Sequence, residues 1–594
     1  MSGVLQRAER PVAADGRGTH TATRAQWLIV IGYLLAAVAV TWRLWADPAN
    51  LMQAHTGDID QSAWFMRYAA TAIAHGRLPA LVTTAMNAPY GINLMWNTSL
   101  LLPGILLTPV TLLAGPQTSL TVALTLGFAG SAASLFLVLR RWGASVPAAT
   151  LGGAVYGFSP ALVHNGLSHY QVQLVILPPL VIDALLRIVT GRGSTVRNGI
   201  WLGLLVAAQL FIGEEVLIFT AVAGIVLVVS LAASWPKEVL RRVRPTAIGL
   251  TTAAAAALPI CAYALWVQFH GVAVPAIAYR TSVSGFVTPS SDLLFHTRAS
   301  AAAVAQSPAQ GVYFSYLGWP LLVTLLAATV FFWGNRKIRT AGVTFLVLEW
   351  FSLGSHVMPF HGMRLPAALL PWDWLQGLPL LRSALPYRLP ILAAGAAAAV
   401  LAFSLDQARS VAADASRWRH VRAAAPAVAV AAVLPLIPLS YPAYPTAPLP
   451  TGWQTVFARL RVAPDAPVMV VPVGYSQIPQ PMRWQADTGE PSSMIGGTFI
   501  AVDRHGLSRR GGRADRSKTA AYLDALWMGS HPRELALWQA RADLRSLRPA
   551  AVVAVTSLRS PLARFLTRLL GPPSYHSGST VAWSLNAAAA GARQ

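Results

Sequence analysis

Charged residues are scarce in this chain of 594 residues, at 11% of the total, and acidic residues are the scarcest of them. There are 22 Asp and Glu against 45 Lys and Arg, whereas hydrophobic residues make up 55%. Soluble domains carry about 25% charged residues, so this composition argues against a soluble protein and indicates a polytopic membrane protein. The single cysteine, Cys261, lies in an apolar run, which excludes a disulfide framework and a cysteine metal site.

The positive charges fall in short clusters between apolar runs, and these clusters predict the topology. The formal net charge of +23 would suggest nucleic acid as a partner in a soluble protein, but the clustering favours the positive-inside rule instead, so no nucleic-acid partner is expected. If every cluster is cytoplasmic, the chain is a multi-pass protein of the cell membrane with about 11 transmembrane helices and a cytoplasmic N-terminal tail at 1–25. The predicted spans are 26–45, 118–139, 146–163, 170–190, 198–213, 215–234, 246–267, 313–333, 340–354, 388–405 and 424–441.

One further apolar stretch, at 100–113, is expected not to cross the membrane. It contains Pro103, Gly104 and Pro109 and is shorter than a comfortable span, and a crossing there would place Arg140 and Arg141 outside the cell. We interpret it as an interfacial or re-entrant helix in the first external loop. The alternative is a true span, with the arginine pair as an exception to the charge rule.

The predicted fold is therefore an all-α membrane domain at 26–441, with an external loop at 46–117, followed by an extracytoplasmic α/β domain at 442–594. The C-terminal segment 442–594 is less apolar than the rest of the chain. It contains β-like runs at 468–473, 550–555 and 580–585, separated by helix-like stretches at 518–528 and 532–541, which is the pattern of a mixed domain.

A short acidic cluster, Gly-Asp-Ile-Asp-Gln at 57–61, follows the first span by about a dozen residues. Two carboxylates just outside a first membrane helix are unusual in a chain so poor in acid. Asp58 and Asp60 are candidates for a general base or for ligands of a divalent cation such as Mg or Mn, which prefers oxygen. The alternative is a solvated loop in which Asp60 caps a helix at 62–75.

The order of these parts resembles the GT-C superfamily of integral membrane glycosyltransferases, which includes actinobacterial arabinosyl- and mannosyltransferases. The residues that carry the resemblance are the acidic cluster at 57–61, the stretch Asn-Ala-Pro-Tyr-Gly-Ile-Asn-Leu at 87–94 and Tyr-Gly-Phe-Ser-Pro at 156–160. The resemblance implies a catalytic acid in the first external loop and juxtamembrane helices over a lipid-linked donor. It also implies transfer of a hexose or pentose from a polyprenyl phosphate to a glycan, glycolipid or protein of the cell envelope.

Within that reading, one of the two aspartates takes the acceptor's proton, and Asp58 ranks first because Gly57 allows a sharp turn beside it. A leaving phosphate needs cations, for which Arg382 and Arg388 are candidates because a guanidinium can donate two parallel hydrogen bonds. The other candidate substrate-binding residues are Glu214, Glu215, His164, His169 and Asn93. In the C-terminal segment, 482–485 and 496–499 are expected to be exposed, and either to contact a glycan acceptor or to stabilise the loops.

Each candidate has a simpler structural explanation. The two glutamates fit an external turn, the histidines an ordinary loop, and the arginines contacts to lipid headgroups. Two other classes of protein also stay open, a transporter or flippase for a lipid-linked sugar and a non-catalytic scaffold for envelope assembly. A transporter would be expected to carry charged, broken helices in mid-membrane, and here the spans are nearly free of charge.

Overall fold

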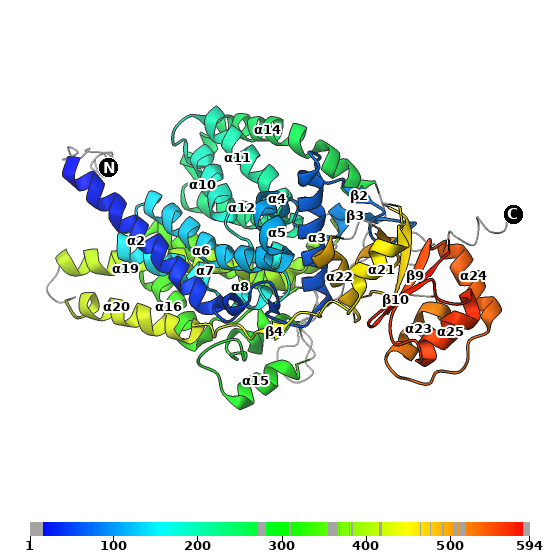
Figure 1. Ribbon diagram of the computed structural model, residues 1–594. Coiled ribbons are helices and arrows are strands. Elements are labelled where there is room, and N and C mark those ends of the chain that lie inside the picture. Colours follow the sequence, from blue (N-terminus) through cyan, green and yellow to red (C-terminus); the bar gives the residue numbers. More distant parts are fainter. Residues whose placement is uncertain are drawn as a thin grey trace.

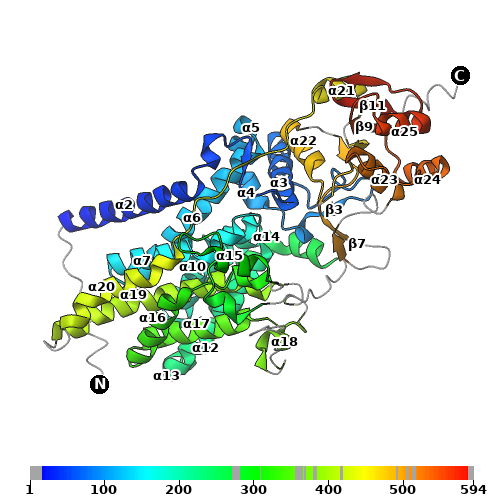
Figure 2. The same cartoon turned by 90° about the horizontal axis from the view of Figure 1, so that it is seen from below.

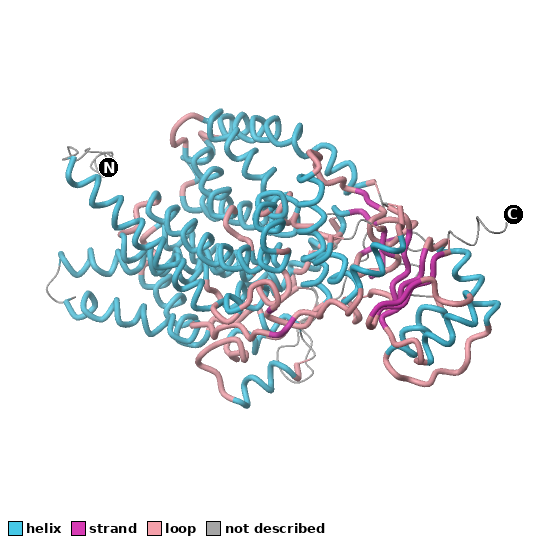
Figure 3. Tube along the Cα trace, in the orientation of Figure 1, coloured by secondary structure: helices cyan, strands magenta, loops and turns pink. Residues whose placement is uncertain are grey.

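The computed structural model describes residues 16–270, 281–307, 310–354, 366, 369–378, 381, 384–414, 419–463, 465–475, 477–489, 492–502, 508–510 and 517–585. Most of these residues are helical and form a bundle, with a smaller sheet-containing part at one end (Figure 1, Figure 3). The longer helices of the bundle are α2 (Gly16–Thr41), α6 (Pro116–Arg141), α7 (Val146–Gly157), α10 (Pro178–Thr190), α11 (Thr195–Leu210), α12 (Glu214–Ser234), α14 (Val243–Phe269), α16 (Gly318–Phe331), α17 (Arg336–Ser352), α19 (Pro390–Asp414) and α20 (Arg419–Val433).

The described helices are those of a membrane protein. Six of them are long and apolar enough to cross a bilayer by length and composition, namely Arg24–Thr41, Pro116–Arg141, Val146–Asn165, Glu214–Ser234, Val243–Phe269 and Pro386–Ser410. Each of the eleven predicted spans overlaps a helix of the bundle, yet several of these helices are short, so the number of crossings stays a prediction.

Small residues let the helices of the bundle approach closely. A Cβ built on Gly203 of α11 would lie 2.3 Å from the Ala253 carbonyl oxygen of α14, and one built on Gly157 of α7 would lie 2.5 Å from the Ala132 Cβ of α6. Neither position has room for a side chain. Helix pairs in membranes use such small residues because no hydrophobic force drives helices together inside lipid.

The stretch at 100–113 forms two short helices, α4 (Leu101–Leu106) and α5 (Thr108–Ala114), on either side of Leu107. At 1.5 Å per residue each is only about 10 Å long, which is far less than the hydrocarbon core of a bilayer. Both pack on α3 (Gly57–Ala74), the main helix of the first loop.

The C-terminal region, residues 442–585, carries a five-stranded mixed sheet. Its order is β10 (Tyr575–Ser577), β11 (Thr580–Ser584), β9 (Ala551–Val555), β5 (Pro467–Val471) and β6 (Ser493–Met494), with β5 parallel to both β9 and β6 and the remaining pairs antiparallel. Its helices are α21 (Trp453–Leu460), α22 (Gln480–Thr488), α23 (Lys518–Trp527), α24 (Leu537–Leu547) and α25 (Pro561–Leu570). The sheet lies at the far end of the molecule from the start of α2 (Figure 1, Figure 2).

The first loop and the C-terminal region contact each other at several points. Strand β1 (Leu51–Met52) pairs with β4 (Tyr444–Pro445), and Met86 forms an isolated bridge with Met494. Side chains of α3 also reach the C-terminal region, where Trp64 donates to the Gln485 side chain at 2.8 Å and Arg67 to the Ala486 carbonyl oxygen at 2.7 Å.

Candidate active site

Both aspartates of the acidic cluster lie in the first turn of α3, since that helix begins at Gly57 and not at residue 62 as predicted. Thr56 is the N-cap residue, with extended backbone at φ −131° and ψ 142°, so the interpretation of Asp60 as the helix cap is wrong. Negative side chains are favourable at this end of a helix because the free backbone N–H groups carry partial positive charge. Residues two apart on a helix do not face each other, so Asp58 and Asp60 meet different surroundings.

Asp58 faces a histidine from a distant segment. Its Oδ2 lies 3.6 Å from Nε2 of His169, and both side chains are 28% exposed. On its other side the His169 ring places Nδ1 2.8 Å from the Ser168 hydroxyl. Asp58 is therefore a carboxylate that solvent can reach, fixed next to an imidazole, and this is an arrangement suited to accepting a proton from a bound hydroxyl.

Asp60 points the other way, into protein. It is only 3% exposed, and its Oδ1 lies 3.6 Å from Nη1 of Arg483 in α22. Arg483 is fully buried and also donates to Asp487 Oδ2 at 3.0 Å and to Gln117 Oε1 at 2.8 Å. Asp60 thus belongs to a buried polar cluster that connects α3, α6 and the C-terminal region, and the structure does not bring it together with Asp58.

Two tail motifs were predicted to be exposed and are instead buried. Residues 482–485 form the middle of α22, where Met482 and Arg483 are fully buried and Trp484 and Gln485 nearly so. Residues 496–499 pack on the first loop, and a Cβ built on Gly497 would lie 2.8 Å from Met86. Neither motif can offer a surface to a glycan, because both form the contact between the C-terminal region and the first loop.

Burial gives Asp60 an unusual titration. Desolvation raises the pKa of Asp60 from 3.8 to about 7, because burial outweighs the attraction of the Arg483 guanidinium, and the nearby Asp487 raises the pKa further. The folded protein therefore holds a proton between about pH 4 and pH 7 that the unfolded chain releases. This contribution to stability is present at low pH and is lost as the pH rises through 7, and it amounts to at most about 4 kcal/mol.

We therefore expect Asp60→Asn to flatten the pH dependence of stability. The apparent melting temperature of the wild type in detergent should fall between pH 5 and pH 8, and that of Asp60→Asn, which has no proton to lose at this position, should fall less. Asp47→Asn is a matched control, because Asp47 is an exposed aspartate of the same loop whose carboxylate accepts from the neighbouring Asn50 side chain. Identical falls in all three proteins would show that Asp60 titrates normally.

Glu215 and Arg388, both candidates from the sequence, form an ion pair. The Arg388 guanidinium contacts Glu215 Oε2, and Glu215 Oε1 accepts from the Leu385 backbone N–H at 2.9 Å. A Cβ on Gly213, which precedes α12, would lie 2.9 Å from the Gln171 carbonyl oxygen, so the start of α12 packs against the segment that follows His169. Glu214 occupies the first position of α12, and Arg382 lies outside the described residues.

His164 has an acidic partner that the sequence did not reveal. Its Nδ1 lies 2.7 Å from Oδ2 of Asp292, and its ring stacks on Tyr313 with centroids 4.3 Å apart. The neighbouring Phe314 packs on Tyr387 at 4.8 Å, directly before Arg388. The one available signal was that Asp292 is the single acidic residue in the sequence of the predicted external segment 268–312.

The contacts of Asn93 give it a structural role, and the two aspartates are poorly placed to bind a metal ion. The Asn93 side chain donates to the Val267 carbonyl oxygen at 3.0 Å and accepts from the Met95 N–H at 2.9 Å, so it fixes the loop to α14. Because Asp58 and Asp60 point in different directions, they cannot chelate one cation as a pair. Across the described part of the chain, no three His, Cys, Asp or Glu side chains gather in a group that would hold a metal ion.

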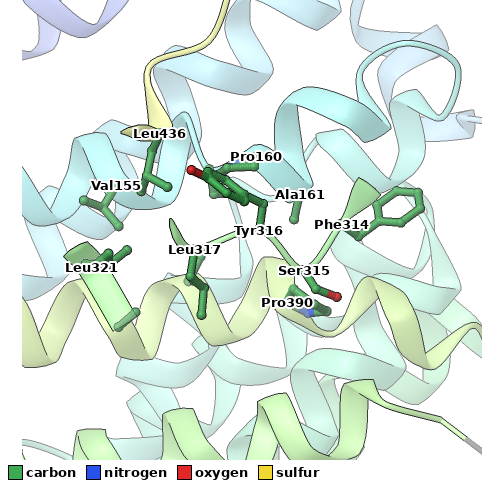
Figure 4. Close-up of a pocket in the computed structure, with 13 residues that line it drawn as sticks. Val155, Pro160, Ala161, Phe314, Ser315, Tyr316, Leu317, Leu321, Pro390 and Leu436 are labelled. Atoms are coloured by element: carbon green, nitrogen blue, oxygen red, sulfur yellow. The ribbon is translucent and has the colours of Figure 1, made fainter. Parts of the chain in front are cut away.

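The motif at 156–160 lines a small apolar pocket rather than a substrate site. Pro160 lies around it with Tyr316, Leu317 and Pro390, as Figure 4 shows, and Ser159 also belongs to its lining. The pocket has a volume of about 10 Å³, which is room for one water molecule. This part of the motif therefore serves helix packing.

Comparison with known proteins supports the fold. No protein-family model and no curated protein matches this sequence. Among solved structures, the chain is similar to the arabinofuranosyltransferase AftD from Mycobacteria, with a TM-score of 0.51, 14% identity and coverage of 95% of this chain and 40% of that one. At this identity the likeness shows a shared fold, which is GT-C-like, and the chain spans less than half the length of that protein.

Two further structures are similar at lower scores. One is the oligosaccharyltransferase AglB from Archaeoglobus fulgidus, with a TM-score of 0.46, 11% identity and coverage of 90% and 69% of the two chains. The other is ArnT from Cupriavidus metallidurans, with a TM-score of 0.41, 13% identity and coverage of 94% and 97%.

Proposed function

Because the chain has a GT-C-like fold, we propose that it is a membrane glycosyltransferase that moves a sugar from a polyprenyl-phosphate donor to a hydroxyl of a cell-envelope acceptor. The observation that carries the proposal is the setting of Asp58, a partly exposed carboxylate in the first turn of α3, 3.6 Å from His169. The proposal includes the predicted topology, with the N-terminus in the cytoplasm, about eleven spans and the C-terminal region outside.

The proposed reaction needs a general base, and Asp58 takes that role. Asp58 accepts the proton of the acceptor hydroxyl while the acceptor oxygen bonds to the anomeric carbon of the sugar. The bond from that carbon to the phosphate oxygen breaks, and its electron pair leaves with the polyprenyl phosphate. The proton then passes from Asp58 to solvent, and no metal is needed to balance the step.

The other paired residues suit binding and positioning. His169 orients the Asp58 carboxylate from one side, and the His164–Asp292 pair offers a polar and aromatic surface of the kind that contacts sugars. Arg388 is held in place by Glu215 close to the start of α19, where a lipid phosphate would enter. Its charge is already balanced there, so we propose that it positions the site rather than binding phosphate as a free cation.

The test is a transfer assay in membranes. Membranes carrying the full-length protein, and matched membranes without it, are supplied with a panel of polyprenyl phosphates bearing labelled hexoses or pentoses. We expect label to appear in a cell-envelope acceptor only when the protein is present, together with release of polyprenyl phosphate in equal amount. A transporter would move the labelled lipid across the bilayer with no covalent transfer, and a scaffold would do neither, so either result would overturn the proposal.

A further inference from the structure

The helix bundle contains a large cavity, which lies away from the acidic cluster at 57–61. It is walled by α6, α10, α12, α17 and α19, and its volume of about 1410 Å³ is larger than the roughly 300–1,000 Å³ of a typical small-molecule site. Its lining runs along α19 from Leu392 to Ser410, a distance of about 27 Å, close to the thickness of the hydrocarbon core of a bilayer. Its length therefore suits a chain-like occupant.

The walls of the cavity change character along its length. The inner part is apolar, with residues such as Leu135, Ile182, Leu227, Leu348 and Leu392. At the other end the lining comes from helix ends and connections and is charged, with six basic side chains (Arg187, Arg192, Arg241, Arg242, Arg336 and Lys337) against three acidic ones (Asp183, Glu238 and Asp406). This charged end lies at the C-terminal end of α12, about 30 Å along that helix from Glu215 and the proposed catalytic site.

Two of the three acidic side chains already have hydrogen-bond or ion-pair partners within the protein. Asp183 is almost fully buried and accepts from Arg141 at 3.1 Å, from Arg187 at 2.8 Å and from the Trp142 indole at 3.0 Å. Asp406 accepts from the Ser145 backbone N–H at 2.6 Å. The six cations and three carboxylates of the lining together leave it with a net positive charge of three.

Three of the cations converge from separate connections. A Cβ built on Gly191 would lie 2.1 Å from Nη1 of Arg242, so this guanidinium rests on the backbone next to Arg192. Lys337 donates to the Trp142 carbonyl oxygen at 2.8 Å, and its pKa is lowered by burial and by the nearby charge of Arg192. Like charges held together in this way favour an anion between them, and arginine and lysine are the usual ligands of phosphate.

We propose that this cavity binds one anionic glycerophospholipid, with its phosphate at Arg192, Arg242 and Lys337 and its acyl chains in the apolar part along α19. A single occupant then satisfies both halves of the lining, the charged end and the long apolar wall. Basic pockets between membrane helices bind anionic headgroups for the same reason. The site is separate from the proposed catalytic site and does not depend on sugar transfer.

The test replaces three cationic side chains at the charged end of the cavity and leaves the helix bundle intact. The cavity triple (Arg192→Gln, Arg242→Gln and Lys337→Gln) is compared with a control triple (Arg197→Gln, Lys237→Gln and Arg244→Gln), which removes as many cations from neighbouring exposed positions that do not line the cavity. Full-length proteins in detergent are titrated with phosphatidylglycerol or phosphatidylcholine, and the bound lipid is counted by native mass spectrometry.

We expect the wild type and the control triple to bind one phosphatidylglycerol in preference to phosphatidylcholine, and the cavity triple to bind it at least about tenfold more weakly. A second variant, Leu227→Trp, fills the apolar wall with every cation in place and should lose both lipids. Equal binding by all proteins, or an equal loss in the two triples, would overturn the proposal. So would displacement of the lipid by inorganic phosphate at the same concentration, since that would indicate a simple phosphate site.

Discussion

Asp58→Asn is expected to lower sugar transfer by about 10²–10⁴-fold with normal amounts of protein in the membrane. A positioned general base contributes about this factor, and an amide of the same shape cannot accept the proton. Asp58 is partly exposed and is paired with His169 at 3.6 Å, so the substitution leaves no charge buried and should not disturb folding. The measurement is the rate of label transfer from the preferred polyprenyl-phosphate sugar, normalised to protein abundance.

Two further aspartate variants make this result specific. Asp47→Asn removes an exposed carboxylate of the same loop and should leave the rate unchanged. Asp60→Asn removes the buried carboxylate, and its effect should appear mainly in stability, with the rate recovering at temperatures where the protein is folded. A full rate in Asp58→Asn, or a loss in Asp60→Asn that persists in folded protein, would move the base from Asp58 to Asp60.

Local features of the fold were predictable, because apolar runs and charge clusters act over short stretches of chain. The helices of the bundle overlap the predicted apolar runs, and β5, β9 and β11 lie within the predicted strand ranges or one residue beyond them. The start of α3 was misplaced because Gly57 and the two aspartates are weak helix formers on intrinsic propensity. In the structure Ile59 is fully buried, so packing fixes the first turn in spite of that propensity.

The partners of the charged residues were not predictable. Asp60 and Arg483 are separated by 423 positions, and Glu215 and Arg388 by 173. Nothing in a single sequence links such distant residues, and an Arg-Trp-Gln stretch is usually exposed, so Arg483 was assigned to the surface. Three-dimensional contact decides which of two neighbouring aspartates is accessible, and this is why the sequence could offer both Asp58 and Asp60 as the base.

Among these single substitutions, Arg483→Met is expected to lower the free energy of unfolding the most. Arg483 is fully buried and contacts Asp60, Asp487 and Gln117, so its loss leaves the buried Asp60 carboxyl without a cation. Breaking a buried ion pair in this way costs about 3–5 kcal/mol. The cost should be smaller at pH 5 than at pH 8, because burial already raises the pKa of both Asp60 and Asp487 and the two groups can protonate.

We expect Arg483→Met to loosen the contact between the first loop and the C-terminal region before the whole protein unfolds, because Arg483 joins these two parts. Hydrogen exchange of the α3 amides should speed up in Arg483→Met at pH 8, before the helices of the bundle lose protection. Arg459→Met, at an exposed position of α21, is the matched control and should stay within about 0.5 kcal/mol of the wild type. The double variant Asp60→Asn with Arg483→Met should recover part of the loss, since it removes the buried carboxyl that Arg483→Met leaves without a cation. If it recovers nothing, the ion pair between Asp60 and Arg483 does not stabilise the contact between the first loop and the C-terminal region.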